Sequence, residues 1–164
     1  MNEARVLLAN NHKLMLEGLS YLLKPTFVIV GMVNDTKSMP TQQRFKKILI
    51  VEDNIDLVHV LGLALELQGY EVIRATDGKQ ALNAVSLYRP DLILLDMSLP
   101  DIDGLEVAHI IRQDQINQSI RILAATGRDS FEYKEKCRRN GCDDYISKPF
   151  TPKQLVSRIE KLLM

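Results

Sequence analysis

Residues 92–104 read LILLDMSLPDIDG, an apolar run followed by Asp96 and a loop that contains Pro100 and Gly104. A continuous apolar run of this kind is typical of a strand that is covered on both faces, as in a parallel sheet. We predict a strand over residues 92–96 and place it at the centre of its sheet, because it is the most apolar strand candidate. A second run, KILIV at residues 47–51, leads in the same way into Glu52 and Asp53.

Strand and helix patterns alternate along the chain from residue 46 onward. Gly69 is suited to end a helix, and Thr151, Pro152 and Gln154 form the pattern of a capping box at the start of the last helix. The alternation predicts a doubly wound α/β fold, a parallel sheet with right-handed crossovers and helices on both faces. The predicted strands cover residues 47–51, 71–75, 92–96, 120–126 and 144–147, and the predicted helices cover 55–68, 78–87, 105–113, 131–139 and 152 to the end.

Polar side chains end or directly follow four of the five predicted strands. The carboxyl ends of parallel strands meet at one edge of the sheet, where such folds bind ligands. We therefore expect these side chains to lie close together. They are Glu52, Asp53, Asp96, Thr126 and Lys148.

The acids of this group predict a magnesium site. Mg²⁺ prefers oxygen ligands in octahedral geometry, and Glu52, Asp53, Asp96 and the backbone carbonyl of Ser98 would suit it. Crowded carboxylates repel one another, which also favours binding of a cation. Helix capping before residue 55 is the alternative role of Glu52 and Asp53, and a strand-end turn is the alternative role of Asp96.

The same edge has the groups needed to accept a phosphoryl group. Asp96 is the candidate nucleophile, since a carboxylate can attack phosphorus to give an acyl phosphate. The Thr126 hydroxyl would donate to a phosphoryl oxygen, and Lys148 would pair first with Asp96 and then with the phosphoryl group. Because Pro149 follows Lys148, a cis peptide bond is allowed between them. A turn residue and a solvated surface lysine are the alternative roles of Thr126 and Lys148.

Four motifs in order resemble the receiver domain of two-component response regulators. They are KILIVED at 47–53, LILLDMSLPDIDG at 92–104, AATG at 124–127 and GCDDYISKPF at 141–150. The resemblance covers residues 46–164 without a gap. It implies a five-stranded sheet in the order 2-1-3-4-5 and Mg²⁺-dependent phosphotransfer from a sensor histidine kinase or a histidine phosphotransfer protein.

The resemblance also implies roles for individual residues. Asp96 is the phosphoacceptor, Glu52 and Asp53 are the metal acids, and Lys148 binds the phosphoryl group. Thr126 is the switch hydroxyl, and Tyr145 is the aromatic residue that changes rotamer in the switch. The alternative for Tyr145 is a purely structural role as a half-buried aromatic residue of a strand. Ser98 and Arg128 match positions that tune the phosphoryl lifetime. Phosphorylation would then change the surface formed by residues 131–139, 144–147 and the last helix, and so control a downstream protein effector.

Residues 1–41 repeat the start of this pattern with an offset of about 42 residues. Residues 5–9 parallel 47–51, residues 27–33 parallel 70–75, and Asn10 and Asn11 fall where Glu52 and Asp53 fall. Residues 3–40 resemble the first βαβ of a second, incomplete receiver of the NarL/FixJ class that lacks the metal acids. We predict a degenerate receiver-like segment at 1–41, a linker at 42–46 and a receiver domain at 47–164. The role of this segment stays open. The alternatives are packing on the receiver, dimerisation, regulation of the receiver, exchange with residues 46–76 of the sheet, or no role, as the remnant of a fusion.

Charge and composition restrict the function further. Residues 46–164 hold 16 basic and 18 acidic side chains, and residues 1–45 hold 5 and 3, so neither part has the basic balance of a direct DNA binder. Neither a membrane span nor a signal peptide is expected, which predicts a cytoplasmic protein. Cys137 and Cys142, the only cysteines, are expected to be small buried residues.

Three function classes remain. The leading hypothesis is a receiver that acts as a switch, not an enzyme, with no covalent output domain after the last helix and with homodimer formation left open. The second is an interaction module that does not depend on phosphorylation, which the complete set of site residues disfavours. The third is a Mg²⁺-dependent phosphatase with an aspartate nucleophile. Such enzymes place a second acid two residues after the first, where this chain has Ser98.

Overall fold

A computed structural model describes residues 5–9, 28–33, 45–128 and 130–164 of the chain. The chain divides into two compact units, residues 1–44 and 45–164, and each is described by itself. None of the described helices is long and apolar enough to cross a membrane.

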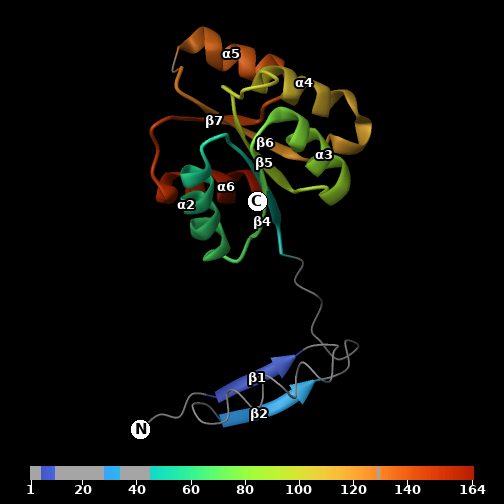
Figure 1. The fold of residues 1–164 in the computed structure, drawn as a ribbon, viewed down its shortest axis with the longest axis vertical. Coiled ribbons are helices and arrows are strands. Elements are labelled where there is room, and N and C mark those ends of the chain that lie inside the picture. The colour runs from blue at the N-terminus through green and yellow to red at the C-terminus, as the bar shows by residue number, and fades with distance from the viewer. Residues whose placement is uncertain (1–4, 10–27, 34–44, 129) are drawn as a thin grey trace. The chain divides into compact units, whose positions relative to one another are not determined.

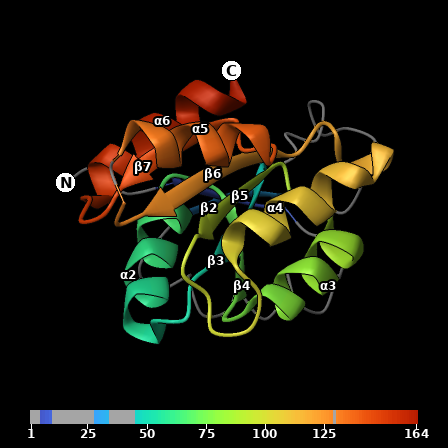
Figure 2. The same ribbon diagram turned by 90° about the horizontal axis from the view of Figure 1, so that it is seen from above.

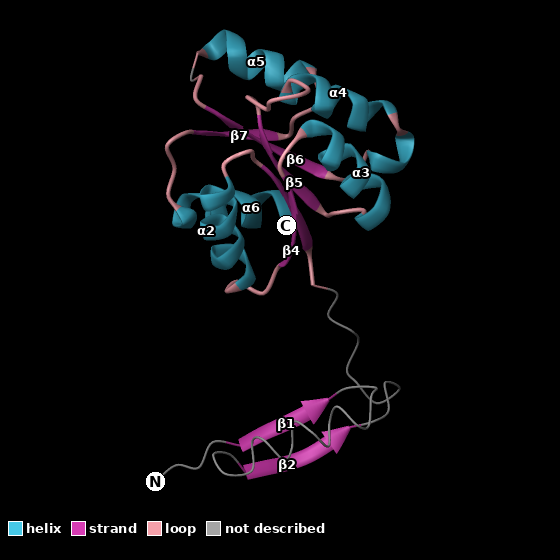
Figure 3. Ribbon diagram, viewed as in Figure 1, coloured by secondary structure: helices cyan, strands magenta, loops and turns pink. Residues whose placement is uncertain are grey.

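The second unit is a parallel five-stranded sheet with helices on both faces (Figures 1 and 3). The strand order is β4-β3-β5-β6-β7, which is 2-1-3-4-5 when the strands of this unit alone are counted. Both the predicted fold class and the central position of the strand at 92–96 are confirmed. The strands are β3 Lys47–Val51, β4 Glu71–Ala75, β5 Leu92–Asp96, β6 Arg121–Thr126 and β7 Asp144–Ser147. The helices are α2 Ile55–Glu66, α3 Gly78–Tyr88, α4 Gly104–Gln113, the short 3₁₀ helix η2 Gln115–Asn117, α5 Phe131–Arg139 and α6 Pro152–Leu163.

Two hydrophobic cores form because successive side chains of a strand point to opposite faces of the sheet. On β5, Ile93 and Leu95 pack with α3, α4 and α5, whereas Leu92 and Leu94 pack with α2 and α6. Figure 2 shows α2 on one side of the sheet and α3 and α4 on the other. All five residues of β5 are buried, which explains the apolar run that predicts this strand.

Helix boundaries follow local capping chemistry closely. Thr151 and Gln154 form the predicted capping box at the start of α6, and Gly69 has the positive φ expected after the end of α2. Helix α2 ends two residues before its predicted end, because Gln68 N donates to the Leu65 carbonyl in a tighter, 3₁₀-type turn. Helix α3 extends to Tyr88 and is capped by Arg89 in the left-handed region, with a φ of 48°.

Gly104 lies where the first turn of α4 crosses the end of β5. A Cβ atom there would meet the Asp96 carbonyl oxygen and would be 2.7 Å from Met97 Cα, so the obstacle is backbone. We expect Gly104→Ala to lower the free energy of unfolding by about 3 kcal/mol, the scale of overpacking in a tight interior. Urea unfolding measures this loss. In Gly127→Ala, where nothing lies within 4 Å of the new Cβ, the change should stay within about 0.5 kcal/mol. Equal stability of the two variants would contradict the prediction.

The first unit contains two described strands, β1 Arg5–Ala9 and β2 Val28–Val33. They pair in parallel from Arg5↔Val28 to Ala9↔Val33, with an irregularity between Val6 and Leu7. Both strands lie where the internal repeat predicts them. The helix of the predicted βαβ lies outside the described residues, as do Asn10 and Asn11. The receiver-like segment and its linker therefore stay predictions.

Candidate functional site

The five polar residues of the sequence pattern lie at the carboxyl edge of the sheet, because the strands pair in register. Val51 is level with Leu95, so Glu52 follows β3 at the level where Asp96 ends β5. Asp96 is in turn level with Ala125, one residue before Thr126. The Lys148 N–H donates to the Thr126 carbonyl at 2.7 Å, which continues the pairing of β6 and β7 past the end of β7.

Three carboxylates form a cluster at this edge. One oxygen each from Glu52, Asp53 and Asp96 lies within 4.8 Å of the other two. Glu52 and Asp96 are each 5% exposed, whereas Asp53 is open to solvent. Charged groups removed from water need a counterion, so this cluster requires positive charge nearby.

Lys148 supplies part of that charge. Its Nζ lies 3.0 Å from Asp96 Oδ2, as the sequence predicts, and 2.6 Å from Glu52 Oε2, which the sequence analysis did not anticipate. Burial opposes the charge of Lys148, but the hydrogen bonds and charges of Glu52 and Asp96 outweigh burial and raise the pKa of Lys148. Burial raises the pKa of Glu52, and the hydrogen bond from Lys148 offsets this effect only in part.

The charge balance fits a divalent cation. Three carboxylates face one ammonium, and their oxygen ligands are the type that Mg²⁺ takes in proteins. The backbone N–H of Ser98 donates to Asp96 Oδ1 at 3.2 Å, which orients the carboxylate on the loop after β5. The contribution of the Ser98 carbonyl stays a prediction.

Thr126 is buried and takes part in the turn after β6. The Arg128 N–H donates to Thr126 Oγ1 at 2.9 Å, and this hydroxyl lies 3.4 Å from the Arg128 carbonyl. The structure therefore contains the turn interaction that was the alternative role of Thr126. The switch role requires the hydroxyl to turn its single hydrogen from the Arg128 carbonyl to a phosphoryl oxygen.

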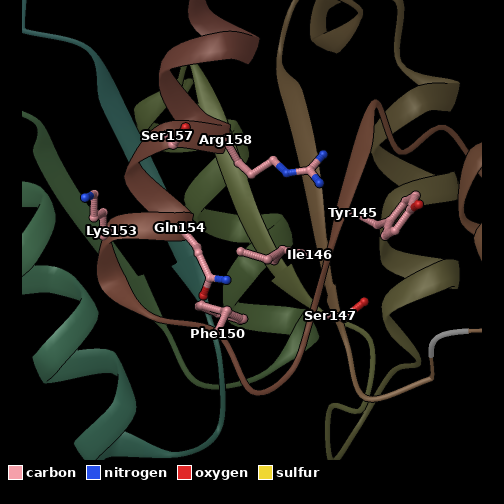
Figure 4. A pocket seen from close by; sticks show the side chains of 8 residues that line it. All are labelled: Tyr145, Ile146, Ser147, Phe150, Lys153, Gln154, Ser157 and Arg158. Atoms are coloured by element: carbon pink, nitrogen blue, oxygen red, sulfur yellow. The ribbon is translucent and has the colours of Figure 1, made fainter.

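Tyr145 is half-buried on β7 and packs against the hydrophobic core on the side of the sheet that α3, α4 and α5 cover. Its ring centroid lies 4.5 Å from Lys134 Nζ, a cation–π contact. Figure 4 shows Tyr145 and Ile146 on opposite sides of β7. The peptide bond between Lys148 and Pro149 is cis, as the sequence allows.

A groove of about 490 Å³ lies between β7 and α6 (Figure 4), and none of the three clustered carboxylates lines it. Arg158 of α6 reaches across to Asp144 at the start of β7, with an Nη1–Oδ2 distance of 2.7 Å. The groove is part of the surface formed by α5, β7 and α6, which is predicted to change on phosphorylation. It is lined by Tyr145, Ile146, Ser147, Phe150, Lys153, Gln154, Ser157 and Arg158.

Two aspartates outside the carboxylate cluster make contacts that the sequence pattern did not predict. Asp101, in the loop after β5, accepts from the backbone N–H groups of Gly78 at 2.7 Å and Lys79 at 3.0 Å, so it ties that loop to the start of α3. Asp143 binds Arg112 Nη2 at 2.6 Å and Arg121 Nη1 at 3.0 Å. The sequence did contain a signal for Asp101, since it is an acid placed directly after Pro100 in the loop that follows the central strand. No local signal identifies Asp143, because its partners lie 31 and 22 residues away.

Comparison with known proteins gives one consistent result. The family model described as "Response regulator receiver domain" matches residues 48–160. The chain is 41% identical over 118 residues to the alkaline phosphatase synthesis transcriptional regulatory protein PhoP of Bacillus subtilis, a match that covers 72% of this chain and 48% of that protein. It is 38% identical over 118 residues to the phosphate regulon transcriptional regulatory protein PhoB of Pseudomonas aeruginosa, covering 72% of this chain and 52% of that protein.

A solved structure has the same fold. The chemotaxis response regulator CheY4 of Vibrio cholerae is 30% identical with a TM-score of 0.70, and the match covers 73% of this chain and 99% of that one. The chain spans about half the length of the curated relatives it matches.

Proposed function

Because this chain belongs to the response regulator receiver domain family, we propose that it is a phosphorylation switch whose phosphoacceptor is Asp96. One observation carries the proposal. The Asp96 carboxylate ends the central strand, is almost fully buried, and lies 3.0 Å from the ammonium of Lys148 among two further acids. A nucleophile, a cation for the incoming phosphoryl group and a cluster of metal-type ligands thus meet at one point.

The phosphoryl donor is a phosphohistidine of a sensor histidine kinase or of a histidine phosphotransfer protein. An Oδ of Asp96 attacks the phosphorus, the bond from phosphorus to the imidazole nitrogen breaks, and the imidazole leaves with the bonding electrons. The product is an acyl phosphate on Asp96. Lys148 neutralises phosphoryl oxygens, since its ammonium already lies beside the attacking carboxylate. Glu52, Asp53, Asp96 and the Ser98 carbonyl would hold Mg²⁺, which would supply positive charge beside the transferring group.

Phosphorylation changes the balance of charge around Lys148. The phosphoryl group adds about −1.5 to −2 charge and three acceptor oxygens. These draw Lys148 from its ion pair with Glu52 and recruit the Thr126 hydroxyl from its turn with Arg128. Tyr145 responds on β7, and the surface formed by α5, β7 and α6 shifts toward a form that binds a partner.

The partner recognised by this surface is a downstream protein effector. The relatives PhoP and PhoB are named transcriptional regulatory proteins, and the chain covers about half of each. Residues 46–164 have 16 basic and 18 acidic side chains, which supports control through a protein partner and not through direct contact with DNA. Incubation with acetyl phosphate and Mg²⁺ tests the function, because the proposal requires an acid-stable and base-labile phosphoryl group on Asp96.

The carboxylate cluster predicts a specific loss of metal affinity. Asp53→Asn should weaken Mg²⁺ binding by about 10-fold or more, the scale on which changes around a metal site alter affinity. Because Asp53 is exposed, the variant should keep its fold. Isothermal titration calorimetry with MgCl₂ measures the change. Asp56→Asn is the matched control, since it removes an exposed carboxylate in the first turn of α2 outside the cluster. Equal affinity in the two variants would remove Asp53 from the metal site.

A further inference from the structure

Helix α5 ends in a Schellman motif that places its two cysteines together. Gly141 has a φ of 95°, its N–H donates to the Arg138 carbonyl at 3.0 Å, and the Cys142 N–H donates to the Cys137 carbonyl at 3.0 Å. This pair of hydrogen bonds defines the motif, in which the residue after the glycine contacts the residue five positions earlier. Those two positions are Cys142 and Cys137, so the turn that ends the helix also brings two thiols together.

The backbone geometry suits a disulfide bond. The N–O distance of 3.0 Å and standard bond lengths keep the two Cα atoms within about 7 Å of each other. Disulfides span Cα distances of about 4.4–6.8 Å. Both side chains also line the same small cavity, which places the two thiols in one environment.

Both thiols also border a space that a small oxidant can enter. They line a cavity of about 120 Å³ together with Lys134, Arg138 and Tyr145. Both residues are free cysteines whose side chains are otherwise buried. The alternative is a purely structural role, in which the two cysteines only fill space in the core.

We infer that Cys137 and Cys142 are a redox-active dithiol that a hydroperoxide converts into an intramolecular disulfide. In the first step the Cys137 sulfur attacks the terminal oxygen of the hydroperoxide, the O–O bond breaks, and Cys137 becomes a sulfenic acid while an alcohol or water leaves. In the second step the Cys142 sulfur attacks the Cys137 sulfur, the S–O bond breaks, and water leaves with the thiol proton. Two thiols and hydrogen peroxide thus give one disulfide and two waters.

The order of the two sulfurs follows from their surroundings. The hydrogen bond from Cys142 lowers the pKa of the Cys137 thiol, whereas that hydrogen bond and burial raise the pKa of the Cys142 thiol. Cys137 is therefore the sulfur that is oxidised first, and Cys142 is the resolving thiol.

The pair lies beside the acceptor loop. Cys137 Sγ donates to the Met97 thioether at 4.0 Å, and Met97 directly follows Asp96. Oxidation removes this thiol hydrogen and restrains the turn between α5 and β7. The chemistry of the dithiol does not depend on phosphorylation of Asp96, so either inference can fail alone.

The test uses the whole 164-residue chain, whose only cysteines are these two. Reduced protein is treated with a small molar excess of hydrogen peroxide, denatured, and alkylated with N-ethylmaleimide before intact-mass measurement. We expect a monomer that has lost two hydrogens and takes up no maleimide, and dithiothreitol should restore two labelled thiols. Two labelled thiols after peroxide treatment would show that the cysteines only pack. Disulfide-linked dimers or sulfinic acids in place of the intramolecular bond would also overturn the inference.

Single variants separate the two roles. Cys142→Ser should stop at the sulfenic acid of Cys137, which dimedone traps as a stable adduct. Cys137→Ser should react more slowly with peroxide than Cys142→Ser does, because burial still raises the pKa of the remaining Cys142 thiol. Equal dimedone trapping in both variants would contradict the assigned order. The measurement on the natural chain decides the main inference even if a variant folds poorly.

Discussion

Asp96→Asn should abolish phosphorylation of this protein by acetyl phosphate and Mg²⁺, with a rate loss of about 10³-fold or more, as for removal of a reacting nucleophile. An amide has the shape of the carboxylate and still accepts the hydrogen bond from Ser98. It lacks the charge and the oxygen nucleophile needed to form an acyl phosphate. The measurement is intact mass after a timed reaction, followed by release of the phosphoryl group in mild base.

The control for this variant is Asp103→Asn. Asp103 lies in the same loop and caps α4, a role that asparagine also fills, and it is not part of the carboxylate cluster. The control should be phosphorylated at the rate of the natural chain. Full phosphorylation of Asp96→Asn would show that another residue is the acceptor and would refute the assignment of Asp96.

Lys148→Met should destabilise the protein in the absence of divalent metal, because it leaves Glu52 and Asp96 buried without their ammonium. We expect a loss of about 2 kcal/mol, less than the 3–5 kcal/mol of a fully buried pair, since Lys148 is one quarter exposed. Addition of Mg²⁺ should restore more stability to this variant than to the natural chain, because the metal then supplies the missing charge.

Urea unfolding with and without MgCl₂ measures both effects. Lys153→Met is the matched control, since it removes an exposed lysine of α6 and should change stability by less than about 0.5 kcal/mol. If Lys148→Met is as stable as this control without metal, the two ion pairs contribute nothing to the folded state.

The regular elements could be predicted because their causes are local. The strand bounds 47–51, 71–75 and 92–96 and the helix 131–139 agree with the structure, since each is set by an apolar run or by capping residues within the segment. The left-handed Arg89 was missed because that conformation normally requires glycine or asparagine, so Arg89 carries no sequence signal.

The site was predictable in outline and not in its contacts. Placing Asp96 and Lys148 at one sheet edge needs only the strand order, and the structure pairs them as expected. The second ion pair, between Lys148 and Glu52, joins residues 96 positions apart and depends on rotamers that a sequence pattern does not specify. The same holds for Asp143, whose two arginine partners come from α4 and β6.

Lys148 is joined to α6 by a very short stretch of chain. Only Pro149 and Phe150 separate it from Thr151, the residue that caps α6, and Phe150 packs against the core that also holds Leu155 and Ile159 of that helix. A change in the position of the Lys148 ammonium is therefore transmitted to the start of α6 through the covalent backbone, because only two residues lie between them. We expect the start of α6 to move together with Lys148 when the charge on Asp96 changes, even if the sheet between them does not move.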